Sequence, residues 1–146
     1  MPQRSTVRRG GYLGLVVAVL LIAACSTSNS SAADDAARVN QFRAAHGVHP
    51  LPRALELDLK AQAQAQRMAN AGTIFHSTSL ASGVSPGWQM IGENVAVAGS
   101  IAQAQSALEA SPPHRENLLD PYFTQMGIGA VQVGNRVFVV QEFVQR

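Results

Sequence analysis

Three side chains of this sequence have the chemistry to bind a metal ion together: His76, Glu93 and His114. Two neutral imidazoles and one carboxylate can hold zinc and leave a fourth position for water, as in catalytic zinc sites. Water bound there becomes acidic enough to attack an ester or an amide. The residues are 17 and 21 positions apart, which fits no local metal motif such as His-Glu-x-x-His. Only the fold can bring them together.

The same residues also have an explanation that needs no metal. Glu93 could be a buried acceptor for backbone N–H groups or for the N–H of His76, because charge-assisted hydrogen bonds are strong. His114 and Arg115 could fix the chain where two prolines interrupt a helix. Residue types alone leave both explanations open.

A first helix is expected from Asp34 onward, with Asp34 or Asp35 as its cap and Gly47 at its end. His46 and His49 fall at the end of this helix and in the loop after it. We expect them to face solvent or to act as charges at the helix C-terminus rather than as ligands.

A second helix is expected over residues 53–71, because its apolar side chains recur on one face: Leu57, Ala61, Ala65 and Met68. Residues 73–87 are rich in Ser, Gly and Pro and are predicted to form a loop. A short helix over 100–109 and a helical turn over 116–119 follow.

The last part of the chain changes to the pattern of strands. Residues 127–133 and 136–144 are rich in β-branched side chains, and Gly134-Asn135 between them is a hairpin signal. Helices followed by a closing strand pair predict an α+β domain.

Four motifs, together with Asn40-x-x-Arg43, carry a resemblance to a known family. They are Phe75-His76, Gly92-Glu93-Asn94, the run from Ser111 to Leu119, and Met126-Gly127-Ile128-Gly129. In this order they resemble the CAP superfamily, which includes the cysteine-rich secretory, antigen 5 and pathogenesis-related 1 proteins and the bacterial SCP-like proteins. The resemblance covers residues 36–143. It implies a three-layer α-β-α sandwich with a small antiparallel sheet.

The resemblance also implies a cleft that holds two histidines and two glutamates in many members, a site associated with divalent metals such as zinc. The matching positions here are His76, Glu93 and His114. The second glutamate position, three residues before the second histidine, is Ser111. This chain therefore has at most three of the four groups, and the general base for hydrolysis is either missing or is Glu109 or Glu116.

The first 24 residues have the parts of a secretory signal: a basic start, an apolar run from about residue 13 to 24, and small residues before Cys25. The run is shorter than the ~20 residues that a membrane-spanning helix needs. The segment Leu21-Ile22-Ala23-Ala24-Cys25 resembles the lipobox of bacterial lipoproteins, in which the cysteine receives a diacylglycerol. An ordinary signal peptide is the alternative. We expect a signal peptide over 1–24, a flexible linker over 25–33, a domain over 34–146, and anchoring at the extracytoplasmic face of the cell membrane.

Removal of residues 1–24 would leave eight basic and nine acidic side chains, with no cluster of Lys or Arg. Binding to nucleic acid is therefore not expected, because nucleic-acid binders carry a basic face or stripe. Cys25 is the only cysteine, which excludes an internal disulfide and a site built from several thiolates.

Three functions remain open at this level. The favoured one is a non-enzymatic module that binds a small hydrophobic or envelope-derived ligand, since the resemblance implies an association with lipids and the catalytic set is incomplete. The second is a metal-assisted hydrolase that uses His76, Glu93 and His114. The third is a surface interaction protein in which the cleft is a relic.

Overall fold

The computed structural model describes residues 30–146. The predicted signal peptide and Cys25 therefore lie outside the described residues. Within residues 30–146, every helix is too short or too polar to cross a membrane.

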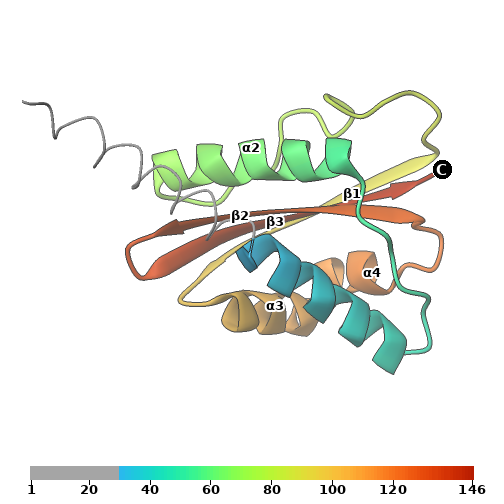
Figure 1. Ribbon diagram of the computed structural model, residues 1–146, viewed down its shortest axis with the longest axis horizontal. Helices are drawn as coiled ribbons and strands as arrows, with labels where there is room; N and C mark the ends of the chain where they lie inside the picture. Colours follow the sequence, from blue (N-terminus) through green and yellow to red (C-terminus); the bar gives the residue numbers. More distant parts are fainter. Residues whose placement is uncertain (1–29) are drawn as a thin grey trace, which may run out of the picture.

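A three-stranded antiparallel sheet forms the middle layer, with strand order β1-β3-β2. Helix α2 covers one face, and the N-terminal helix lies with α3 and α4 on the other (Figure 1). The elements in chain order are the N-terminal helix (helical from residue 30 to 45), α2 (Leu55–Ala71), β1 (Met90–Ala98), α3 (Ile101–Ala110), α4 (Pro112–Leu119), β2 (Gln125–Val133) and β3 (Arg136–Gln145). The predicted α+β class and the α-β-α sandwich are confirmed.

Several predicted boundaries need correction. The N-terminal helix is already formed at residue 30, so Asp34 and Asp35 lie inside it, and residues 30–33 belong to the helix rather than to a linker. Ala32 packs in the core, which gives a physical reason for this extension. The helix before Pro112 and Pro113 ends at Ala110, as predicted, but the two prolines also begin α4, where the missing N–H of proline costs no hydrogen bond.

Strand β1 was not predicted. It contains Gly92, Glu93 and Asn94, residues that are depleted in strands, and it lacks an alternation of polar and apolar side chains. Its central residues are buried on both faces of the sheet, because helices cover both. The strand forms because it pairs with β3 along its whole length, from Met90↔Gln145 to Ala98↔Val137.

Helix α2 lies unusually close to β2 because two glycines remove the side chains between them. A Cβ placed on Gly127 would lie 2.1 Å from the backbone carbon of Leu57, and one on Gly129 would lie 2.2 Å from that of Ala61. This proximity brings the side chains of the helix within reach of the edge of β2. Asp58 Oδ1 accepts the N–H of Ile128, and Gln62 Oε1 accepts that of Ala130.

A polar network lies beneath the opposite face of the sheet, where Gln141 of β3 is fully buried. The Gln141 amide donates to Asp35 Oδ2 and to Gln105 Oε1, each at 2.8 Å. Burial raises the pKa of Asp35 to about 7. The network ties the N-terminal helix and α3 to the central strand, and Asn94 extends it to the backbone of α4 at His114.

The close contact between α2 and β2 predicts that two glycine substitutions lower the free energy of unfolding by different amounts. Gly129→Ala should lower the free energy of unfolding by about 3 kcal/mol or more, because backbone atoms of α2 must move away. Gly99→Ala is the control, since the only atom closer than 3.4 Å to its Cβ is the mobile end of Gln103. It should change stability by less than ~1 kcal/mol. Urea unfolding of both variants measures this, and equal effects would contradict the predicted close contact.

Candidate functional site

The site is built on two glutamates that face each other across the central strands. Glu93 of β1 is the pairing partner of Glu142 of β3, so both side chains stand on the face of the sheet that α2 covers. Both side chains are almost completely buried, with 1% and 0% of their surface exposed. Lys60 of α2 reaches Glu142, and its Nζ donates to Glu142 Oε1 at 2.5 Å.

The loop after α2 is fixed to Glu93 by three hydrogen bonds. The N–H of Ser77 donates to Glu93 Oε1 at 2.8 Å, and its hydroxyl donates to Oε2 at 2.5 Å. His76 Nδ1 lies 2.8 Å from the same Oε1. The side chain of His76 is itself 57% exposed, so one edge of its ring meets the buried carboxylate and the remainder faces solvent.

The pKa values of the two glutamates are shifted in opposite directions. Burial would raise the pKa of Glu93, but the hydrogen bonds from Ser77 and His76 outweigh it and hold this pKa below its usual value. The pKa of Glu142 is raised to about 7, mainly by burial and also by the Glu93 carboxylate, whereas Lys60 opposes the rise. Glu142 Oε2 is buried and has no hydrogen-bond partner among the residues described. A proton on this oxygen would make it a hydrogen-bond donor instead of a buried acceptor without a partner.

The second histidine of the predicted set is held separately. His114 Nδ1 lies 2.8 Å from the hydroxyl of Ser111, the residue that stands at the second family glutamate position. Burial lowers the pKa of His114, and a positive charge on His76 lowers it further. The structure therefore joins His76 to Glu93 but gives His114 a different partner.

The predicted metal ligands do not form a three-ligand site in this arrangement. In the part of the chain that the structure describes, no three His, Cys, Asp or Glu side chains are grouped so that they could hold a metal ion. Both oxygens of Glu93 already accept hydrogen bonds.

The remaining candidate residues lie outside the carboxylate pair. Glu109 accepts a hydrogen bond from Gln105, and Glu116 is exposed on α4. Among residues 30–146, neither is hydrogen-bonded to His76, Glu93 or His114. As expected, His46 and His49 are exposed, and they contact Phe42 and the backbone of Phe123.

Three residues of the site were not predicted: Lys60, Ser77 and Glu142. One signal was available for Glu142, which is a charged residue within the apolar strand sequence of β3. A carboxylate in such a strand requires a partner, because burying an unpaired charge is costly. Nothing in the sequence indicates that the partner is Lys60, which is 82 positions away.

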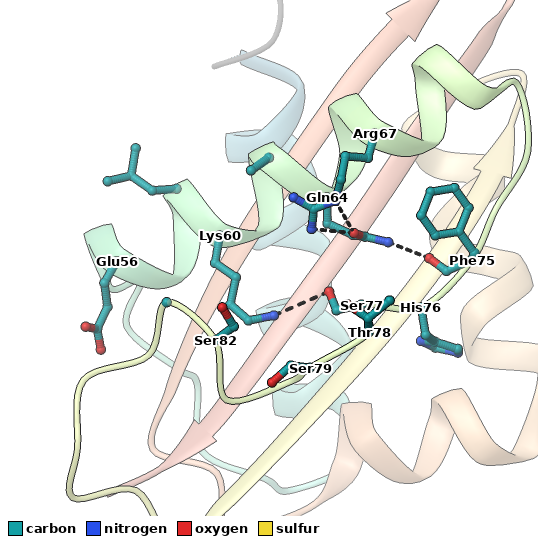
Figure 2. Close-up of a pocket in the computed structure, with 13 residues that line it drawn as sticks. Glu56, Lys60, Gln64, Arg67, Phe75, His76, Ser77, Thr78, Ser79 and Ser82 are labelled. Carbon is teal, nitrogen blue, oxygen red and sulfur yellow. Dashed lines mark hydrogen bonds between the residues drawn. The ribbon is translucent and has the colours of Figure 1, made fainter.

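Two grooves lie on either side of His76 and Ser77. The larger, of about 670 Å³, lies between α2 and the loop residues 75–83. Figure 2 shows Gln64 between Arg67 and the main chain of Phe75, with Lys60 pointing toward Ser77. The smaller groove, of about 410 Å³, lies beside β1 and is lined by residues that include Ile91, Glu93 and Asn117.

Comparison with solved structures shows the same fold in bacterial proteins. An extracellular protein of Bacillus anthracis that contains an SCP domain is 23% identical, with a TM-score of 0.69 over 82% of this chain and 41% of that protein. An outer surface protein of Borrelia burgdorferi is 19% identical, with a TM-score of 0.65 over 76% of this chain and 89% of that one. A cysteine-rich secretory protein of Staphylococcus aureus is 17% identical, with a TM-score of 0.66 over 82% of this chain and 39% of that one.

A search of curated proteins gave no match. The sequence itself matches the family model of the cysteine-rich secretory protein family over residues 36–143. This range contains every motif that carried the resemblance to the CAP superfamily, and it also contains Glu142. The match therefore confirms that resemblance. The chain belongs to the CAP family, the cysteine-rich secretory protein family.

Proposed function

We propose that this protein is an extracytoplasmic, lipid-anchored binding module whose larger groove holds a small hydrophobic or envelope-derived ligand. The observation that carries the proposal is the groove itself, which has a volume of about 670 Å³ beside the His76–Glu93 pair. A groove of this size falls within the range of small-molecule sites, which combine apolar walls with a few fixed polar groups.

The walls of the groove have this mixed character. Leu59 and Phe75 line it and are 63% and 39% exposed, so a ligand would remove apolar surface from water. Arg67 is held by two hydrogen bonds to Gln64 Oε1, and the Gln64 amide donates to the carbonyl of Phe75 at 2.6 Å. Since Gln64 is fully buried, this chain of contacts holds one wall of the groove in a defined position.

Export to the cell surface is supported by the signal sequence before Cys25 and by the nature of the structural relatives. The Bacillus anthracis relative is an extracellular protein and the Borrelia burgdorferi relative an outer surface protein. The chain spans 41% of the first and 89% of the second.

Hydrolysis is supported less well. The contact between His76 and Glu93 resembles the base and orienting acid of a hydrolase. In a hydrolase, however, the base must lie within hydrogen-bond reach of a nucleophile that it activates. The neighbouring Ser77 hydroxyl donates to Glu93 rather than to His76. The residues described here therefore provide a hydrogen-bonded pair without an activated nucleophile.

Ligand binding in the groove predicts a stability change that depends on Phe75. Palmitate, cholesterol and phosphatidylglycerol in micelles are the probes. A ligand present at 100 times its Kd stabilises the folded state by about 2.7 kcal/mol, so at least one probe should raise the melting temperature of the wild type by several degrees. Phe75→Ala should lose most of this shift because it removes part of the apolar wall. Tyr122→Ala is the matched control, since Tyr122 is an exposed aromatic residue that does not line the groove.

Two results of this measurement would count against the proposal. One is the absence of a shift with all three probes, which would favour a surface interaction protein with a relic cleft. The other is an equal shift in wild type and Phe75→Ala, which would place the ligand elsewhere.

Anchoring through Cys25 has a separate test in a bacterial host. Cys25→Ser removes the thiol that would receive the diacylglycerol, so the protein should move from the membrane fraction to the soluble extracytoplasmic fraction. Immunoblotting of both fractions measures this, with Ser26→Ala as the control. A Cys25→Ser protein that stays in the membrane fraction would disprove the anchor.

A further inference from the structure

The two outer edges of the sheet are completed in different ways. On β2, three alternate N–H groups point outward, and each has an acceptor: Met126 donates to the carbonyl of Pro52, Ile128 to Asp58 and Ala130 to Gln62. These bonds are 2.9 to 3.0 Å long. The segment before α2 and the side chains of α2 thus close this edge against a further strand.

The outward residues of β1 follow from the same pattern. Alternate residues of a strand direct their backbone N–H and C=O groups to opposite sides. Because Ile128 directs its N–H away from β3, its pairing partner on β3 and every second residue from that partner direct their backbone groups toward β1. Pairing then leaves the N–H and C=O groups of Ile91, Glu93, Val95 and Val97 directed away from β3. One bond agrees with this assignment, from Asn117 Nδ2 to the carbonyl of Glu93 at 3.5 Å. Within residues 30–146 it is the one hydrogen bond that reaches these outward groups.

The smaller groove lies along this incompletely paired edge. Residues 91–93 of β1 line it, together with His76, Ser77 and Leu80 of the loop and Asn117 of α4. The volume is about 410 Å³. The groove is therefore lined by the loop, by the start of β1 and by α4.

We propose that this groove binds an extended peptide segment of a partner protein, which pairs with the outer edge of β1 at Ile91 and Glu93. Outward donors and acceptors recur at every second residue, about 6.8 Å apart in an antiparallel strand. The main chain of another extended segment supplies complementary groups at the same interval, whereas a lipid tail has none. The carbonyl of Glu93 has a second lone pair beside the long contact to Asn117.

The walls of the groove favour a single strand over a second copy of this domain. Residues of the loop and of α4 flank the edge, so an incoming sheet with its own covering helices would meet both walls. Peptide side chains on one face would meet His76 and Leu80, and those on the other face would meet Asn117. This site lies on the opposite side of Ser77 from the groove proposed for a hydrophobic ligand, so each can fail without the other.

Periodic methylation of a bound peptide tests the strand pairing. Hexapeptides are selected by phage display on the whole mature chain, and the strongest is synthesised with each amide N-methylated in turn. Fluorescence anisotropy should show affinity falling at least about tenfold at alternate amides and changing less than about threefold at the intervening ones, because only alternate amides face β1. Failure to select a peptide that binds below millimolar concentration, or losses without this alternation, would overturn the proposal.

Proline substitution in β1 tests the same claim from the protein side. Ile91→Pro removes an outward N–H without removing a bond to β3, and proline is tolerated on the outer side of an edge strand. It should weaken the selected peptide at least about tenfold, while Val97→Pro, outside the groove, and Ile91→Val should stay within about threefold. Circular dichroism establishes that each variant is folded.

Two outcomes of the variant series would overturn the proposal. One is equal binding by Ile91→Pro and wild type. The other is concentration-dependent dimerisation of the free chain that Ile91→Pro abolishes, which would assign the edge to a second copy. If Ile91→Pro does not fold, the methylation series alone decides.

Discussion

The burial of two carboxylates side by side, Glu93 and Glu142, is the constraint on which the rest of the site depends. Neighbouring strands place them on one covered face of the sheet, where two like charges cannot both persist without compensation. The compensation comes from two sides: Lys60 approaches Glu142 from α2, and Ser77 and His76 approach Glu93 from the loop. The same bonds fix that loop on the sheet, and the loop forms a wall of both grooves.

Helix α2 makes this compensation possible because it lies so close to the sheet. The absence of side chains at Gly127 and Gly129 lets the helix backbone approach β2, and Lys60 can then reach the buried Glu142. From the same helix, Asp58 and Gln62 close the outer edge of β2, and Gln64 holds the carbonyl of Phe75. One helix therefore supports the fold, closes one sheet edge and positions the groove wall.

Sequence patterns predicted most of the helices and the closing hairpin, because their signals are local: an apolar helix face, Gly47 as a helix end, and Gly134-Asn135 as a turn. Strand β1 could not be found in this way, since it is stabilised by pairing with β3 and not by its own composition. Residue chemistry left the hydrogen bond between His76 and Glu93 as one of two explanations, and the family motifs implied that both residues share a cleft; their spacing predicted neither. Ser77 and Lys60 were missed because their roles arise from partners 16 and 82 positions away.

The most direct test of the account is the titration of the two buried glutamates by carbon-13 NMR of their side-chain carboxyl groups. Glu93 should titrate below the ordinary glutamate pKa of 4.5, because Ser77 and His76 stabilise its charge. Glu142 should titrate with a pKa of about 7, because it is buried beside that charge. Titration of both carboxyls together, near the ordinary value of 4.5, would contradict the account.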